Sequence, residues 1–184
     1  MSFCKRRFDY GTSEPLLQQL HAEKIKQLVI PPVKGLFWGI VALSFISGYL
    51  SLLALSAGPI LVDILSKWIR FKNNPANTAQ IALAVARSYL AFLFQCCSFV
   101  SRYYLIWSIV FLPFLPALSV AILGMHLLAG VVEYFIKRPK LNLASFLIYF
   151  SLEQVSYQLG VWWGCFRHFS FTSVNPKLVN KTGD

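Results

Sequence analysis

Acidic residues are scarce in this chain, whose 184 residues include only seven aspartates and glutamates. No two of them have Asp-x-Asp spacing, and the sequence has no His-Glu-x-x-His, no Gly-x-Ser-x-Gly and no Gly-rich phosphate loop after a strand. The four cysteines lack metal-site spacing, so we interpret them as small membrane hydrophobes: Cys4, Cys96, Cys97 and Cys165. The sequence therefore predicts neither a complete catalytic site nor a metal site within this chain.

Charged residues of both signs are also few, at 13% of the chain against 57% hydrophobic and 16% aromatic residues. Soluble domains average about 25% charged and about 45–50% apolar residues, so this composition indicates a membrane protein, and the length allows one domain. The net charge of +10 comes from basic residues in short runs between apolar segments. That placement favours contact with membrane lipid over nucleic acid.

The same charge distribution predicts a multi-pass protein of the cell (inner) membrane with both termini in the cytoplasm, because every charged connection is basic. We expect no cleavable signal peptide, since no apolar core follows the basic N-terminus within the first 28 residues.

Residues 1–34 form the most polar stretch and predict an amphipathic helix lying on the membrane surface. Thr12 or Ser13 would cap this helix, Glu14 would stand in its first turn, and Pro31-Pro32 would stop it. The predicted apolar face consists of Leu16, Leu17, Leu20 and Leu28.

Residues 35–66 are apolar apart from Asp63, and they are too long for one untilted span of about 20 residues. Gly48 near the middle predicts a tight hairpin of two short helices. The alternative is a single span over 36–57, broken at Gly58-Pro59.

Residues 81–101 are long enough to span, but Arg87 lies a third of the way along and Arg102 closes the segment. We slightly favour a helix lying partly in the membrane interface over a spanning one.

A second hairpin is predicted over 103–136, with Pro113 and Pro116 near its turn. His126 in this run is interpreted as a hydrogen-bonded packing residue. The predicted fold is thus all-α, a polytopic helical membrane protein with about four spans, arranged as two hairpins plus interfacial amphipathic helices. Its predicted parts are an interfacial segment (1–34), a membrane-embedded helical domain (35–168) and a polar tail (169–184).

The last apolar stretch, 143–167, contains most of the unusual polar groups. At helical spacing one face carries Glu153, Tyr157, Gly160 and Gly164. The Gly-x-x-x-Gly pair predicts close approach of a second helix. Because these polar groups would be costly in lipid, we expect this face to pack on protein or to border a wet cavity.

The sequence leaves two interpretations of Glu153 open. It could orient a substrate or proton path, or it could be neutral or paired with Arg87 or Arg102. Trp162 and Trp163 are interpreted as anchors at the membrane interface rather than as a stacking platform.

One phosphate-binding hypothesis follows from the N-terminus. Guanidinium forks and free amides at a helix start bind phosphate together, which points to Arg6, Arg7, Tyr10, Gly11 and Thr12. The competing interpretation is a capped surface helix with topology-setting charges.

The N-terminal segment RRFDYGTSEPLLQQLHAEKIKQLVIPP resembles the segment that follows the catalytic domain in family 2 glycosyltransferases of the mycofactocin-system type. LEQVSYQLGVWWGCFRH resembles the C-terminal Asp-Asp-x-Ala-Tyr-x-x-Gly-Val-Trp-x-Gly segment of that group. Glu153 and Gln154 replace the two aspartates. The middle of the chain is similar only in being hydrophobic.

This resemblance implies a membrane-associated region whose N-terminal basic residues meet the donor diphosphate. The nucleotide-sugar and the divalent metal would bind a separate catalytic domain, which this sequence lacks. A split gene, a broken reading frame and a recruited remnant would each explain that.

The expected function is therefore a membrane-anchoring part or subunit of a family 2 glycosyltransferase, inactive alone and partnered by a catalytic chain. The alternative is a non-enzymatic helical scaffold or assembly subunit that packs with other membrane subunits through its glycine faces.

Overall fold

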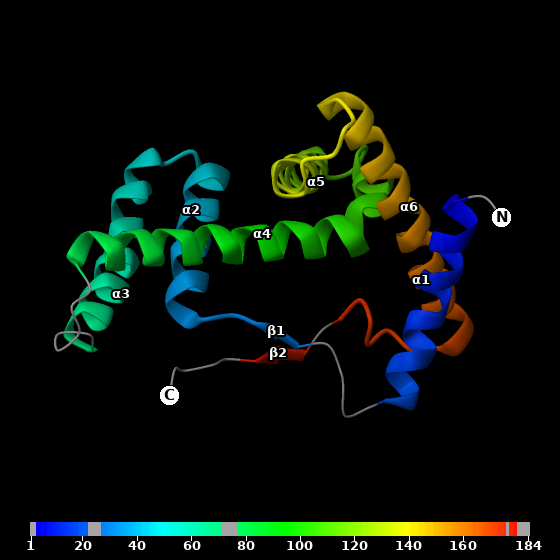
Figure 1. Ribbon diagram of the computed structural model, residues 1–184, viewed down its shortest axis with the longest axis horizontal. Helices are drawn as coiled ribbons and strands as arrows, with labels where there is room; N and C mark the ends of the chain where they lie inside the picture. Colours follow the sequence, from blue (N-terminus) through cyan, green and yellow to red (C-terminus); the bar gives the residue numbers. More distant parts are fainter. Residues whose placement is uncertain (1–2, 22–26, 71–76, 176, 180–184) are drawn as a thin grey trace. The chain divides into compact units, whose positions relative to one another are not determined.

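The computed structural model describes residues 3–21, 27–70, 77–175 and 177–179, and most of them are helical. The helices are α1 (Phe3–Leu20), α2 (Pro32–Ser47), the 3₁₀ helix η2 (Leu50–Ser56), α3 (Ala57–Arg70), α4 (Thr78–Phe111), α5 (Pro116–Lys137) and α6 (Leu143–His168). Two short strands, β1 (Gln27–Val29) and β2 (Lys177–Val179), pair with each other (Figure 1).

Three helical segments of the described chain are long and apolar enough to cross a membrane. They are Leu50–Arg70, which joins η2 to α3, and the helices α4 and α5. A shorter apolar helix covers Pro32–Ser44. The fold is thus helical, with segments compatible with a membrane protein.

The chain divides into two compact units. The first contains Met1–Gln27 and Phe94–Lys177, and the second contains Leu28–Leu93 and Leu178–Asp184. Helix α4 contributes its N-terminal part to the second unit and its C-terminal part to the first.

In the second unit, α2 ends at Gly48, which has a left-handed φ of 74° that favours glycine. This is where the sequence predicts a turn. Tyr89 of α4 joins the other helices of the unit, because its carbonyl oxygen accepts from Trp38 Nε1 (3.3 Å) and its hydroxyl donates to the Pro59 carbonyl oxygen (3.4 Å).

The prediction for 81–101 as a segment separate from 103–136 is wrong, because α4 runs unbroken through the first segment and into the second, as far as Phe111. No glycine or proline interrupts Thr78–Phe111, and exposed Arg87 and Arg102 do not disturb helical backbone. The break falls instead between Phe111 and Pro116, around the predicted prolines, and α5 follows. The helix that ends before the predicted prolines is therefore 34 residues long and begins at Thr78 rather than at Tyr103.

The N-terminal helix also differs from its prediction. It begins at Phe3 and ends at Leu20, well before Pro31-Pro32. Pro31 instead stands at the N-cap of α2, and Leu28 lies in β1. The prolines thus start a helix rather than stop one, consistent with the proline preference for a first turn.

Candidate functional site

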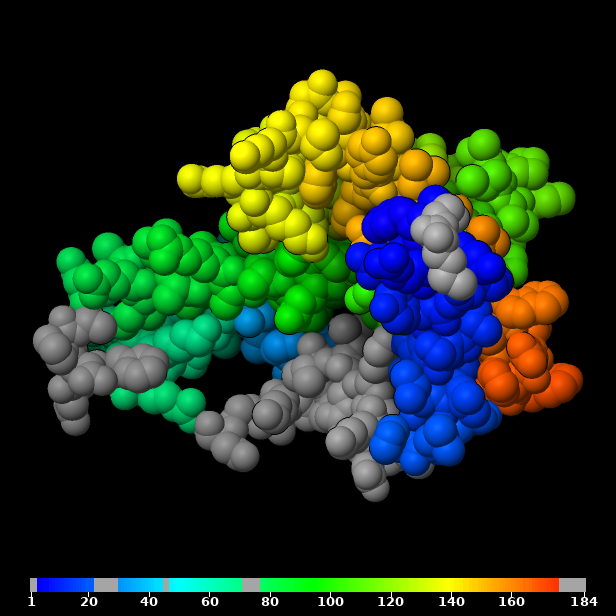
Figure 2. Space-filling view, turned by 45° about the vertical axis from the view of Figure 1, so that its right-hand side comes forward, coloured from blue at the N-terminus to red at the C-terminus, as the bar shows by residue number. Residues whose placement is uncertain are grey.

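Helices α1 and α6 are in backbone contact through three glycines. A Cβ added to Gly160 would collide with the Phe8 carbonyl oxygen, and one added to Gly11 would collide with the Tyr157 carbonyl oxygen. A Cβ on Gly164 would lie 2.5 Å from the Thr12 carbonyl oxygen. Of the two predicted glycines of α6, Gly160 therefore meets a matching glycine of α1, Gly11, while Gly164 lies against Thr12. Figure 2 shows α1 in blue beside α6 in orange.

The face of α1 that meets α6 is small and polar rather than leucine-rich. Gly11, Glu14, Pro15 and Gln18 are buried. By contrast, the predicted apolar face is exposed at Leu16, Leu17 and Leu20. The leucines therefore remain available to an apolar surrounding such as a membrane surface.

Glu14 supplies a buried carboxylate to this interface. It is only 8% exposed, and its Oε1 accepts from the Tyr103 hydroxyl (3.0 Å). Its Oε2 accepts from the Tyr157 hydroxyl. This one carboxylate therefore joins three helices, α1, α4 and α6. The two hydroxyl donors offset the cost of burying it, because a buried carboxylate is stable only when it is hydrogen-bonded.

Electrostatics around the carboxylate follow from this geometry. Burial, then the hydrogen bond to Glu14, raises the pKa of Tyr157, while the Arg102 guanidinium opposes that shift. The guanidinium lies over the Tyr157 ring, 4.6 Å from its centroid. Tyr157 is thus a hydrogen-bond donor, held protonated across the physiological range.

Glu153 pairs with neither Arg87 nor Arg102. Its Oε1 lies 2.6 Å from a guanidinium nitrogen of Arg7, with both side chains about one-third exposed. The predicted partners are wrong because α1 lies along α6, which brings an N-terminal arginine to this face. Glu153 thus forms a second charged link between the two helices.

The predicted helix start at Thr12 or Ser13 is wrong. Both residues lie within α1, where Thr12 Oγ1 donates to the Phe8 carbonyl oxygen (3.0 Å) and Ser13 Oγ donates to that of Tyr10 (2.9 Å). Back-bonding of this kind satisfies a hydroxyl inside a helix. No free amides therefore accompany these residues, and the phosphate-binding hypothesis loses one of its two components.

The five residues of that hypothesis are separated in the structure. Gly11 and Thr12 face α6, and Arg7 is paired with Glu153. Arg6 and Tyr10 are exposed on α1. Only these two retain access to a ligand or partner.

Helix α6 also bonds to the backbone of α4. Trp162 Nε1 donates to the Tyr103 carbonyl oxygen (2.8 Å), and Gln158 Oε1 accepts from the Ile106 amide (3.0 Å). Side chains that replace helical hydrogen bonds cause kinks. Figure 1 shows α4 changing direction before its C-terminal end.

The two tryptophans have different environments. Trp162 packs edge-on against Trp107, with ring centroids 5.1 Å apart, whereas Trp163 is 58% exposed. Of the two, only Trp163 is exposed enough to act as an anchor at the membrane interface, because Trp162 packs between α4 and α6.

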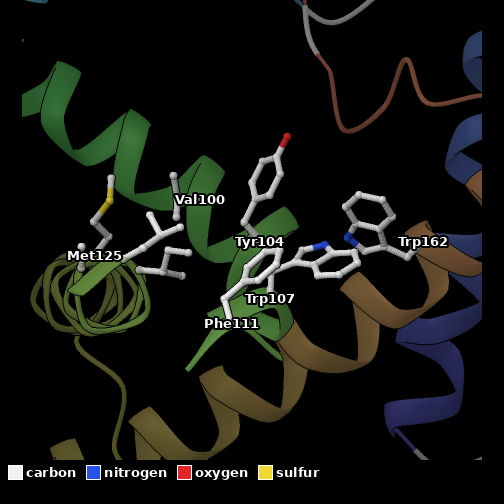
Figure 3. Close-up of a pocket in the computed structure, with 9 residues that line it drawn as sticks. Val100, Tyr104, Trp107, Phe111, Met125 and Trp162 are labelled. Atoms are coloured by element: carbon white, nitrogen blue, oxygen red, sulfur yellow. The ribbon is translucent and has the colours of Figure 1, made fainter. Parts of the chain in front are cut away.

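A largely apolar pocket of about 450 Å³ lies between α4, α5 and α6 (Figure 3). Its walls consist of Val100, Tyr104, Trp107, Phe111, Leu118, Ala121, Ile122, Met125 and Trp162. This volume is typical of small-molecule sites. The hydroxyl of Tyr104 donates to the Val174 carbonyl oxygen (2.6 Å), and most of the remaining wall is apolar, so the pocket suits an apolar group.

His126 joins α5 to both neighbouring helices. Its Nδ1 lies 2.7 Å from Ser101 Oγ, and its Nε2 lies 2.8 Å from Ser151 Oγ. Because the Ser151 hydroxyl donates to the Leu147 carbonyl oxygen, Ser151 accepts from Nε2–H, and Nδ1 accepts from Ser101. Both ring nitrogens are occupied in helix packing.

Among the residues that the structure describes, no three His, Cys, Asp or Glu side chains gather as a metal site. The groups that sequence reasoning missed are Glu14 and Tyr103. The signal for Glu14 was the spacing Gly11, Glu14, Gln18, a small and polar stripe on one face of a helix that starts at Phe3. No pattern in the sequence pointed to Tyr103.

Searches against protein-family models, curated proteins and solved structures find no match to this chain.

Proposed function

We propose that this chain is the membrane-anchoring region or subunit of a family 2 glycosyltransferase, and that it acts with a catalytic domain on a separate chain. The observation that supports this proposal is the contact between α1 and α6. The two segments that resemble the enzyme group come from opposite ends of the sequence, and they lie against each other through Gly11 and Gly160. A shared structural role explains why both segments carry the resemblance.

In this proposal the helices form about four spans in two hairpins, with both termini at the cytoplasmic face of the inner membrane. The buried Glu14 and the glycine contact hold α1 in a fixed position on α6. Such preorganisation reduces the cost of presenting a helix to a partner.

The donor diphosphate would be contacted from the exposed side of α1. Arg6 supplies a guanidinium, whose forked donors suit phosphate oxygens, and Tyr10 supplies a hydroxyl. Arg7 acts indirectly in this scheme, because its guanidinium pairs with Glu153.

A photo-crosslinking experiment tests the partner. Benzoylphenylalanine replaces Tyr10 in the tagged chain, membranes of the native host are irradiated, and the crosslinked protein is identified by mass spectrometry. The expected product contains a nucleotide-sugar-binding domain with an Asp-x-Asp motif. The same group at Tyr149, which is exposed on α6, is the matched control and should give no such product.

Sugar transfer by the reconstituted pair completes the test. Arg6→Ala should reduce transfer while leaving the crosslink at position 10 intact. A crosslinked partner without a catalytic domain, or transfer unaffected by Arg6→Ala, contradicts the proposal. The first of these outcomes favours the non-enzymatic scaffold.

A further inference from the structure

A polar pocket of about 260 Å³ lies within the first unit, on helices α4, α5 and α6. Ser98 and Arg102 of α4, Glu133 and Lys137 of α5, and Glu153 and Gln154 of α6 contribute to its walls. It is somewhat smaller than the roughly 300–1,000 Å³ of pockets for drug-sized ligands. Its size therefore suits a small charged group rather than a whole nucleotide-sugar.

The carboxylates of this pocket already have cationic partners. Glu133 Oε2 lies 2.6 Å from Lys137 Nζ, and Glu153 Oε1 lies 2.6 Å from Arg7. Within the described chain Arg102 forms no ion pair with a carboxylate, and its guanidinium rests on the Tyr157 ring. A cation held against an aromatic face keeps its edge free for a planar or tetrahedral anion.

The position of the pocket along the helices adds a second argument. Helix α5 is a candidate span that ends at Lys137, and exposed Arg138 and Lys140 follow directly. A basic cluster at the end of a span stands at the level of lipid headgroups, where anionic phosphates concentrate. The basic residues at the end of α5 and the expected position of the pocket at the headgroup level therefore both favour an anionic ligand.

We propose that this pocket binds a phosphate group, carried by an anionic phospholipid or free in solution. Arg102 provides a guanidinium fork, Lys137 provides an ammonium group, and Ser98 and Gln154 provide neutral donors. The Arg7–Glu153 pair neutralises the carboxylate that would otherwise repel the ligand. This site does not depend on the glycosyltransferase proposal, since none of these four side chains contacts the donor diphosphate in that proposal.

The test measures thermal stabilisation of the purified chain in detergent as phosphatidic acid, phosphatidylcholine or inorganic phosphate is added. Phosphatidic acid should raise the unfolding temperature in a saturable way, and phosphatidylcholine should not. Stabilisation by inorganic phosphate at similar concentration supports the site with a soluble ligand, whereas a strong preference for phosphatidic acid supports the lipid.

Variants locate the binding. Lys137→Gln changes a side chain that is 59% exposed, so folding is retained, and it should weaken the apparent affinity roughly tenfold or more because a charge-assisted bond is lost. Arg102→Gln should do the same, and Arg102→Lys should restore part of the affinity if Arg102→Gln proves unstable. Arg167→Gln, on the exposed end of α6, is the control for bulk electrostatics.

Two results overturn the proposal. One is equal stabilisation of the wild-type chain by phosphatidylcholine and phosphatidic acid. The other is an affinity that Lys137→Gln leaves unchanged, or that Arg167→Gln lowers to the same extent.

Discussion

Gly160 of α6 lies against the carbonyl oxygen of Phe8 in α1 so closely that the interface has no room for a methyl group. The contact is made by backbone on both sides. It places a polar stripe of α1 on a polar stripe of α6 and buries Glu14 between them. The sequence predicts that the N-terminal helix lies on the membrane surface, whereas in the structure one of its faces forms a backbone-to-backbone interface with α6.

Gly160→Ala should destabilise the protein, because the new methyl group would collide with backbone and force the helices apart. We expect a loss of about 1–3 kcal/mol, typical of overpacking, measured as a lower unfolding temperature in detergent. Gly124→Ala is the matched control, since nothing lies within 4 Å of its added Cβ. That variant should be neutral or slightly stabilising. Equal stability of both variants would contradict the contact.

Cys165 should report whether α1 is docked. It is fully buried beside Gly164, and burial, then the Glu14 charge, raises its pKa to about 11. Since the thiolate is the reactive form, maleimide should label exposed Cys4 rapidly at neutral pH and Cys165 very slowly. In a background with Cys96 and Cys97 replaced by serine, Gly160→Ala should accelerate labelling of Cys165. Rapid labelling of Cys165 in the unaltered interface would argue against docking.

Tyr157→Phe should destabilise the protein by roughly 1.5–3 kcal/mol, because it removes a hydrogen bond to a buried carboxylate. Tyr149→Phe, on the exposed side of the same helix, is the control and should be nearly neutral. A double-mutant cycle with Glu14→Gln should show that the two losses are not additive. Additive losses would mean that the two side chains do not interact.

The Arg7–Glu153 pair should contribute less. Both side chains are about one-third exposed, and such pairs are typically worth about 0–1 kcal/mol. Arg7→Glu should lower stability through like-charge repulsion, and adding Glu153→Arg should restore it. The difference should shrink at high salt. If the reversed pair does not restore stability, the effect of Arg7→Glu does not arise from its interaction with Glu153.

His126→Ala should cost about 1–3 kcal/mol, since it breaks two interhelical hydrogen bonds and leaves a gap beside Phe150. His21→Ala is the control, because His21 is exposed after the end of α1. Thermal unfolding of both variants is the measurement. Similar values for the two would show that His126 does not join the helices.

Local patterns predicted the local features. The stretch 143–167 coincides with α6 to within a residue, and the turns fall at Gly48 and near Pro113 and Pro116. Glycine and proline act on backbone conformation directly, so their effect is readable without knowing the partner helix.

Long-range partners were not predictable in this way. Tyr157 and Glu14 are 143 residues apart in the sequence, and no local spacing connects them. The start of α1 was misplaced because Thr12 and Ser13 are good caps in isolation, yet docking on α6 favours a helix that continues past them. Tertiary contacts overrode a local preference.

The joining of α1 to α6 has a consequence in time. The ribosome completes α6 only after roughly 150 residues have followed α1, which at about 5–20 residues per second takes on the order of ten to thirty seconds. Throughout that interval Glu14 has no Tyr157 to bind, and the glycine surface of α1 has no counterpart. Helix α1 can therefore dock only after α6 has been made, and until then the side chain that it later buries, Glu14, lacks its hydrogen bond from α6.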